Sequence, residues 1–194
     1  PVEKKSMSLI RYEPYGVVGC ILPWNYPLSL MGWKLAPALA AGNTIIMKPS
    51  EITSTSLLHW AEIVGDIMPP GVLNVITGYG AEAGEEIVKH PSIPVITFTG
   101  SVKTGKRIAM HAAENLKKVS LELGGKDPAI ICDDADIDVA AKGTSWGALV
   151  NSGQVCTSIE RVYVFSNVAD RFTESLVEES KKVKLGDPMD ADTD

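Results

Sequence analysis

Short β-branched and apolar runs alternate along the chain with longer segments in which apolar residues recur at helical spacing. Strands are predicted at 16–22, 44–48, 73–77, 95–99 and 119–123, with helices at 54–66, 81–89 and 102–113 between them. Another helix is predicted from Pro27, which suits a first helical turn, to Gly42, which suits a helix end. This order predicts a doubly wound α/β fold, in which a mostly parallel sheet has helices on both faces.

The alternation continues with less regular spacing after Gly125. Strands are predicted at 129–132 and 161–165, and helices at 137–151 and 168–183. We therefore place a domain boundary near 122–125, with one α/β domain over 14–121 and the beginning of a second α/β domain over 122–194. Ligands bind open parallel sheets at the carboxyl ends of the strands, so chemistry is expected there.

A glycine-rich segment, Gly100-Ser101-Val102-Lys103-Thr104-Gly105-Lys106, lies between a predicted strand and a predicted helix. Glycines allow backbone N–H groups to approach phosphate oxygens, and a helix N-terminus favours negative charge. The next residue is Arg107, where a nucleotide-hydrolysing P-loop needs a serine or threonine for Mg²⁺. The pattern therefore predicts phosphate binding without ATP hydrolysis, and the alternative is a turn that binds nothing.

The segment Lys48-Pro49-Ser50-Glu51 follows the second predicted strand. An acidic residue at this place can accept hydrogen bonds from ribose hydroxyls and would repel a 2′-phosphate. The alternative is a helix start in which the acid lies near the positive end of the helix dipole. The residues alone leave both interpretations open.

Two further residues could perform covalent and acid–base chemistry. Cys156 lies among glycine and polar residues at the end of a predicted helix, where a thiolate could act as a nucleophile. Glu122 lies between two leucines at a strand end, where partial desolvation would favour a general base. The alternatives are a structural thiol and a salt bridge.

Composition and charge exclude several functions. The net charge of −6 and the absence of a basic stripe argue against nucleic acid as a partner. The apolar runs are too short to span a bilayer, so no membrane association is expected. Cys20, Cys132 and Cys156 suit a reducing compartment, which favours the cytoplasm. The histidines His59, His90 and His111 have no metal-ligand spacing and are expected at the surface, so no metal site is predicted.

Five motifs in order along the chain carry a family resemblance. They are Pro23-Trp24-Asn25-Tyr26-Pro27, Lys48-Pro49-Ser50-Glu51, Phe98-Thr99-Gly100-Ser101, Glu122-Leu123-Gly124-Gly125-Lys126 and Gly153-Gln154-Val155-Cys156. In content and order they resemble the NAD(P)-dependent aldehyde dehydrogenase superfamily, over a stretch from near Arg11 to at least Phe165. The resemblance overrides the alternatives left open for the single residues.

The resemblance implies a covalent oxidation of an aldehyde to a carboxylic acid. Cys156 would attack the aldehyde, and the Asn25 side-chain amide and the Cys156 N–H would hold the oxyanion. Hydride transfer to the coenzyme would leave a thioester, which water activated by Glu122 would hydrolyse. NAD is expected as coenzyme because of Glu51, with NADP as the alternative because Lys48 could accommodate a phosphate.

The resemblance also implies which residues bind the coenzyme. Domain 14–121 would be the NAD-binding domain, a Rossmann-like domain, and 122–194 the first part of the catalytic domain. The implied coenzyme-binding residues are Ile21, Leu22, Pro23, Trp24, Lys48, Ser50, Glu51, Gly78, Phe98, Thr99, Gly100, Ser101, Leu123 and Gly124.

The resemblance further implies parts that this sequence does not include. Residues 1–13 are expected to be part of an oligomerisation arm, so that the whole protein would form a homo-oligomer, a dimer or a tetramer. The family's later coenzyme motif and most of its catalytic domain would lie beyond Asp194, so the 194-residue chain by itself is expected to be inactive. Residues 151–156, followed by 160–164, resemble microbial lactaldehyde and glycolaldehyde dehydrogenases.

Three alternatives remain for the function. A CoA-acylating aldehyde dehydrogenase would transfer the acyl group to a thiol, although that route does not need Glu122 as a hydrolytic base. A P-loop phosphotransferase would use Gly100–Lys106, against which Arg107 argues. A non-catalytic nucleotide-binding protein would keep the scaffold without the chemistry, although Asn25, Glu122 and Cys156 would then be retained without a use.

Overall fold

The chain folds into two compact units, which are described separately. The computed structural model describes residues 7–194, and the first unit ends at Leu123 while the second comprises Gly124–Asp194. The predicted arm lies only partly within this range. Residues 1–6 are outside it, and residues 7–13 have no regular secondary structure and expose apolar side chains such as Leu9 and Ile10.

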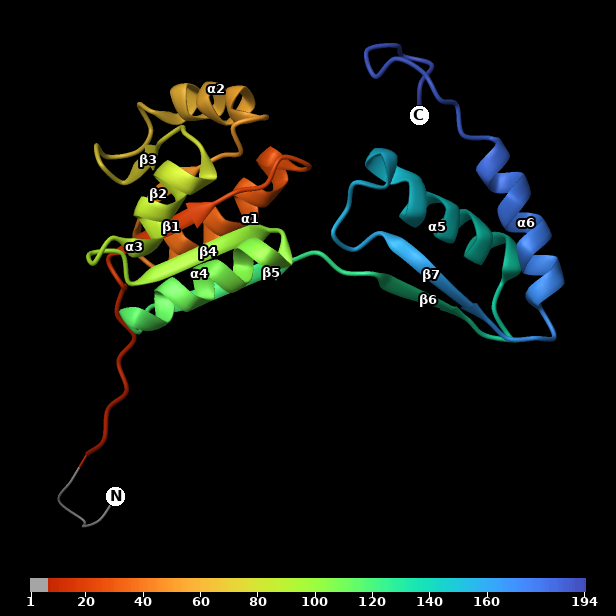
Figure 1. Ribbon diagram of the computed structural model, residues 1–194, viewed down its shortest axis with the longest axis horizontal. Coiled ribbons are helices and arrows are strands. Elements are labelled where there is room, and N and C mark those ends of the chain that lie inside the picture. Colours follow the sequence, from red (N-terminus) through yellow and green to blue (C-terminus); the bar gives the residue numbers. More distant parts are fainter. Residues whose placement is uncertain (1–6) are drawn as a thin grey trace. The chain divides into compact units, whose positions relative to one another are not determined.

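A five-stranded parallel sheet forms the centre of the first unit (Figure 1). Its strands are β1 (Val17–Ile21), β2 (Thr44–Lys48), β3 (Leu73–Val75), β4 (Val95–Gly100) and β5 (Lys118–Leu123). They lie in the order β3-β2-β1-β4-β5, and every neighbouring pair is parallel. The predicted doubly wound parallel fold is therefore confirmed, and the strand order changes direction between β1 and β4, where such sheets bind ligands.

Helices cover both faces of this sheet (Figure 1). On one face, α1 (Pro27–Ala40) and α2 (Ser54–Val64) pack on a core that includes Cys20 and Met47. On the other, α3 (Glu85–Lys89) and α4 (Val102–Glu114) pack on a core that includes Ile96. Because successive side chains of a strand point to opposite faces, the three inner strands β1, β2 and β4 contribute to both cores, which explains their apolar runs in the sequence, whereas the edge strands β3 and β5 each contribute to one core.

The packing of α2 gives a test of this core. Leu57 is the buried residue of α2 and has no exposed surface, so Leu57→Ala is expected to lower the free energy of unfolding by about 2–5 kcal/mol. The neighbouring Leu58 is 42% exposed, and Leu58→Ala is expected to cost less than about 1 kcal/mol. Urea denaturation followed by circular dichroism measures both variants, and equal losses would contradict the described packing.

The segment predicted as one helix over 81–89 differs from the prediction. A π-helical turn over Gly80–Gly84 precedes α3, which is only one short helix. Gly84 is buried against the Lys48 side chain, and Gly78 before the turn has a φ of 146°, which is open to glycine alone. The wider turn therefore brings the backbone close to the end of β2.

The second unit is a smaller α/β unit. Its two parallel strands are β6 (Asp127–Ile131) and β7 (Ile159–Val164), and its helices are α5 (Ile137–Leu149) and α6 (Ala169–Lys181). Phe172 of α6 packs with Ile137 and Ala141 of α5 in its core. The helix predicted to extend to residue 151 ends at Leu149, because a 3-10 turn over Val150–Gly153 follows.

No helix within residues 7–194 has both the length and the apolar character needed to cross a membrane.

Candidate functional site

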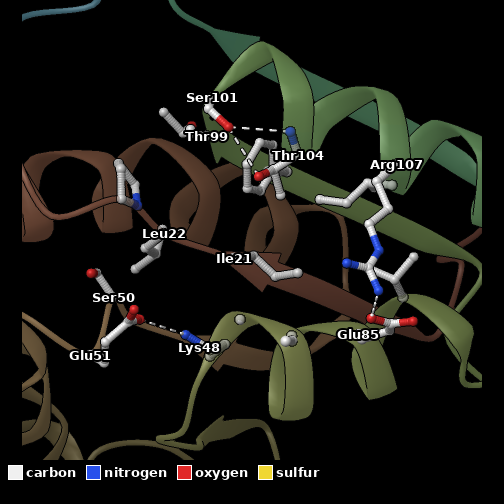
Figure 2. A pocket seen from close by; sticks show the side chains of 18 of the residues that line it. Ile21, Leu22, Lys48, Ser50, Glu51, Glu85, Thr99, Ser101, Thr104 and Arg107 are labelled. Atoms are coloured by element: carbon white, nitrogen blue, oxygen red, sulfur yellow. Dashed lines mark hydrogen bonds and ion pairs between the residues drawn. The ribbon is translucent and has the colours of Figure 1, made fainter.

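A cleft opens at the carboxyl ends of β1, β2 and β4, on the first unit. It encloses a cavity of about 350 Å³. Most of the predicted coenzyme-binding residues line it: Ile21, Leu22, Pro23, Trp24, Lys48, Ser50, Glu51, Phe98, Thr99, Gly100 and Ser101. They come from three segments that are far apart in the sequence, and the parallel sheet brings them together at one edge (Figure 2).

Three predicted coenzyme-binding residues do not line this cavity. Gly78 lies in the turn before Gly80–Gly84, where a Cβ atom would meet Ala83 at 2.9 Å. The side chain of Leu123 packs on Gly105 of α4 and joins the core. Gly124 belongs to the second unit. These three residues were implied by the family resemblance, which does not show which way their side chains or backbone face.

Lys48 and Glu51 form an ion pair at one side of the cavity (Figure 2). The Lys48 side chain is 3% exposed, and its Nζ lies 3.6 Å from Glu51 Oε2 and donates to the Pro49 carbonyl at 2.9 Å. Glu51 is 45% exposed. A buried cation beside a more exposed carboxylate offers a donor and an acceptor to a hydroxylated ligand, as ribose requires.

The helix α4 begins at the cavity. Its N-cap residue Ser101 accepts a hydrogen bond from the Thr104 N–H at 3.2 Å and donates one to Thr104 Oγ1 at 3.0 Å. At Gly100, a Cβ atom would lie 2.5 Å from Phe98 Cζ, so glycine is needed for the ring to occupy its place. The start of a thirteen-residue helix in a cleft favours a bound anion such as a phosphate group.

Thr99 provides a test of whether the cleft fits a polar ligand. Its side chain lines the cavity and is only 5% exposed, and among the described residues its Oγ1 has no hydrogen-bond partner. A buried hydroxyl without a partner is unfavourable unless a bound group satisfies it. Together with the apolar wall, the ion pair and the helix start, this hydroxyl fits a dinucleotide.

A cluster of charged residues in the same cavity was not anticipated. Glu85 of α3 and Arg107 and His111 of α4 line the cavity, although His111 was expected at the surface. The signal in the sequence was the spacing of Arg107 and His111, which are four residues apart and therefore share one face of α4. The partner on α3 could not be read from the sequence, because it depends on how the two helices pack.

Asn25 and Glu122 lie beside the cavity lining. Asn25 follows the lining residue Trp24, between β1 and α1, and Glu122 on β5 is paired in register with Thr99 on β4. Glu122 is exposed within this unit, so the unit's own side chains do not provide the desolvation expected from the flanking leucines.

Lys34 of α1, a residue that the sequence did not single out, donates a hydrogen bond to Thr97 Oγ1 at 2.9 Å. Burial lowers the pKa of Lys34, while nearby Cys20 and Glu122 raise it.

In the second unit, Cys156 follows a tight turn with unusual backbone geometry. Asn151, Ser152 and Gly153 all have positive φ, at 53°, 56° and 72°. The turn is closed by a hydrogen bond from the Gln154 side chain to the Asn151 carbonyl at 3.0 Å. Left-handed backbone at residues other than glycine is unfavourable and is concentrated at functional positions.

The three cysteines differ in accessibility. Cys156 is half-buried and Cys132 is exposed, whereas Cys20 is fully buried. Burial raises the pKa of Cys20 to about 12, so this thiol is unreactive near neutral pH. The Cys156 thiol is thus more accessible to solvent than Cys20 and less exposed than Cys132.

Comparisons with known sequences agree with one another. The model of the aldehyde dehydrogenase family matches residues 1–194. Betaine aldehyde dehydrogenase 1 of Oryza sativa subsp. japonica is 50% identical over 184 residues, which are 94% of this chain and 36% of that protein. Retinaldehyde dehydrogenase 3 of Rattus norvegicus is 45% identical over 196 residues, covering 100% of this chain and 38% of that protein.

Solved structures show the same likeness. Betaine aldehyde dehydrogenase of Staphylococcus aureus, in complex with NAD⁺, superposes with a TM-score of 0.88 at 44% identity, over 93% of this chain and 36% of that one. An NADP-dependent enzyme of E. coli superposes with a TM-score of 0.90 at 41% identity, over 93% and 38%. The chain thus spans little more than a third of the length of these relatives.

Proposed function

This chain belongs to the aldehyde dehydrogenase family, and we propose that it carries the coenzyme site, the nucleophile and the general base of an enzyme that oxidises an aldehyde to a carboxylic acid. The observation that supports the proposal most is the cleft at the strand ends, where an unpartnered Thr99 hydroxyl, the Lys48–Glu51 pair and the start of α4 meet. The accessible Cys156 in a strained turn supports it independently.

In the proposed reaction, Cys156 forms a bond to the aldehyde carbon. Its thiolate sulfur attacks, and the carbonyl electron pair moves to the oxygen, which the Asn25 amide and the Cys156 N–H stabilise. The carbon then loses its hydrogen with both bonding electrons, and the C=O bond forms again as a thioester. NAD(P)⁺, when bound, supplies the acceptor for this hydride.

The thioester is released by water in the second half of the proposed reaction. Glu122 takes a proton from water, and the oxygen attacks the acyl carbon. The bond between carbon and Cys156 sulfur then breaks, and the sulfur leaves as a thiolate, ready for the next aldehyde. A carboxylic acid is the product. If CoA instead of water took the acyl group, the product would be an acyl-CoA, which product analysis with and without CoA distinguishes.

For the coenzyme, we propose NAD in preference to NADP. Glu51 is about half exposed at the cavity and would lie beside the ribose, where its charge would repel a 2′-phosphate. The residues assigned to the coenzyme are those that line the cavity, and Gly78, Leu123 and Gly124 remain proposals that rest on the family resemblance alone.

A substitution tests both coenzyme binding and the role of Glu51. The chain is expected to bind NADH, and Glu51→Gln is expected to raise the affinity for NADPH relative to NADH about five-fold, because one repulsion of about 1 kcal/mol is removed. Glu62→Gln on α2, where the side chain is 82% exposed, is the matched control and should change neither affinity. Fluorescence titration with the two reduced coenzymes gives both values, and binding of neither would contradict the proposed coenzyme site.

The substrate is proposed to be a small aldehyde. Residues 151–156 and 160–164 resemble lactaldehyde and glycolaldehyde dehydrogenases, whereas the relatives described above are named for betaine aldehyde and retinaldehyde. We therefore propose short hydroxyaldehydes as the first substrates to compare with betaine aldehyde. A homo-oligomer and a cytoplasmic location are proposed as well, on the family resemblance and on the three free cysteines.

A further inference from the structure

The cluster at the α3–α4 side of the cavity has no role in the reaction proposed above. Glu85 accepts a hydrogen bond from Lys89 Nζ at 2.6 Å, contacts Arg107 Nη2 through its other oxygen, and lies 3.7 Å from His111 Nε2. The Lys89 hydrogen bond lowers the pKa of Glu85, and the charge of Arg107 acts in the same direction against desolvation. One carboxylate thus contacts two cations, Lys89 and Arg107, and lies near an imidazole.

Arg107 is fixed at one edge and open elsewhere. Its Nη2 contacts Glu85, while 59% of its side chain is exposed and lines the cavity. A guanidinium group has five N–H donors and two flat faces, so the contact with Glu85 leaves most of it available to a ligand. The ion pair joins α3 to α4, but both of its residues also line the cavity, which indicates that it can contact a ligand as well.

The position of this pair indicates which part of a dinucleotide it would meet. Figure 2 shows Arg107 and Glu85 at the opposite end of the cavity from Leu22, Ser50 and Ser101. Because Asn25 is proposed to hold the oxyanion of the reacting aldehyde, the reacting ring of the coenzyme would lie toward Asn25, and the start of α4 at Ser101 would hold the pyrophosphate. The heterocyclic base of the adenosine half is then the part left for the α3–α4 end.

The surroundings of Arg107 suit such a base. Val88 and Ile108 provide an apolar surface from the two helices, and both are buried. An uncharged aromatic ring can lie on this surface and meet a guanidinium group with its face, which is a favourable cation–π and stacking contact. A phosphate group would instead meet both a cation and the Glu85 carboxylate, and would gain less.

We propose that Arg107, positioned by Glu85, recognises the base of the coenzyme's adenosine half by packing its guanidinium group against the ring. The inference rests on the proposed function, because it assumes that this cavity binds NAD(P). Arg107 is the contact residue, and Glu85 is a positioning residue that fixes the plane of the guanidinium group. A purine, with its larger ring system, is expected to gain more from this contact than a pyrimidine.

The experiment compares ADP with UDP, which share the ribose and the two phosphates and differ in the base. Calorimetric titration of the 194-residue chain is expected to show tighter binding of ADP, and Arg107→Ala is expected to weaken ADP about five-fold while changing UDP by less than about two-fold. Arg107→Lys keeps a cation for Glu85 but has no flat face, so it should also lose the preference for ADP. Lys103→Ala, on the same helix, exposed and outside the cavity, is the matched control.

Each outcome decides between the interpretations. Full recovery of ADP binding in Arg107→Lys would overturn the inference, because any cation paired with Glu85 would then suffice. Equal weakening of ADP and UDP in Arg107→Ala would also overturn it, since distortion of the cavity affects both ligands. If the unsubstituted chain binds NADH but Arg107→Ala binds ADP normally, only this inference fails. If it binds none of these ligands, the proposed coenzyme site fails as well.

Discussion

Replacing Cys156 with serine is expected to abolish acid formation in the enzyme that includes this chain, with a loss in kcat of at least about a thousand-fold. The reason is chemical, because a hydroxyl group without an adjacent base is a far weaker nucleophile than a thiolate. The unit that contains Cys156, Gly124–Asp194, has no histidine to serve as such a base. The rate of NADH formation from an aldehyde measures the loss.

Cys132→Ser is the matched control for this variant. Cys132 lies in the same unit and is more exposed than Cys156, so both variants remove one accessible thiol and differ only in its position. The control should retain the rate of the unsubstituted enzyme. A Cys156→Ser variant that oxidised aldehyde at more than about a tenth of that rate would contradict the role of Cys156 as nucleophile.

Replacing Glu122 with glutamine is expected to slow steady-state turnover about 10²–10⁴-fold, because the general base for hydrolysis is removed. The first turnover should remain, because formation of the thioester does not use Glu122 in the proposed reaction. Rapid mixing is therefore expected to show a burst of NADH that equals the enzyme concentration, followed by a slow phase.

Glu114→Gln provides the comparison for Glu122→Gln. Its carboxylate is 69% exposed on α4, outside the cavity. Glu114→Gln therefore removes the same negative charge as Glu122→Gln without removing the proposed base. This variant should show ordinary turnover. Loss of the burst in Glu122→Gln, or turnover at the rate of Glu114→Gln, would contradict a role of Glu122 in the hydrolysis step.

The fold of the first unit could be predicted from the sequence because its local signals agree. Pro27 at the helix start and Gly42, with a φ of 79°, after the helix end delimit α1, and the apolar runs delimit β1 and β2. Parallel strands also place their carboxyl ends at one edge, so the meeting of Lys48, Glu51 and Ser101 followed from the fold class.

Features that depend on tertiary packing could not be predicted in this way. The Glu85–Arg107 pair requires the α3–α4 contact, and the π-helical turn over Gly80–Gly84 is a local change of helix type that apolar spacing does not reveal. The helix predicted over 137–151 extended into the turn before Cys156, where Asn151 adopts left-handed backbone, as does Ser152 after it. Asparagine tolerates this conformation more readily than most residues, but the apolar spacing that predicted the helix does not register it.

The central claim is that Cys156 carries the substrate as a thioester, and its most direct test is the mass of the enzyme during turnover. The Glu122→Gln enzyme is mixed with aldehyde and NAD⁺, quenched in acid and digested, and the peptide that contains Cys156 is expected to gain the mass of the acyl group. An unmodified Cys156 peptide after a full burst of NADH, or an acyl group on Cys132 in its place, would contradict the account.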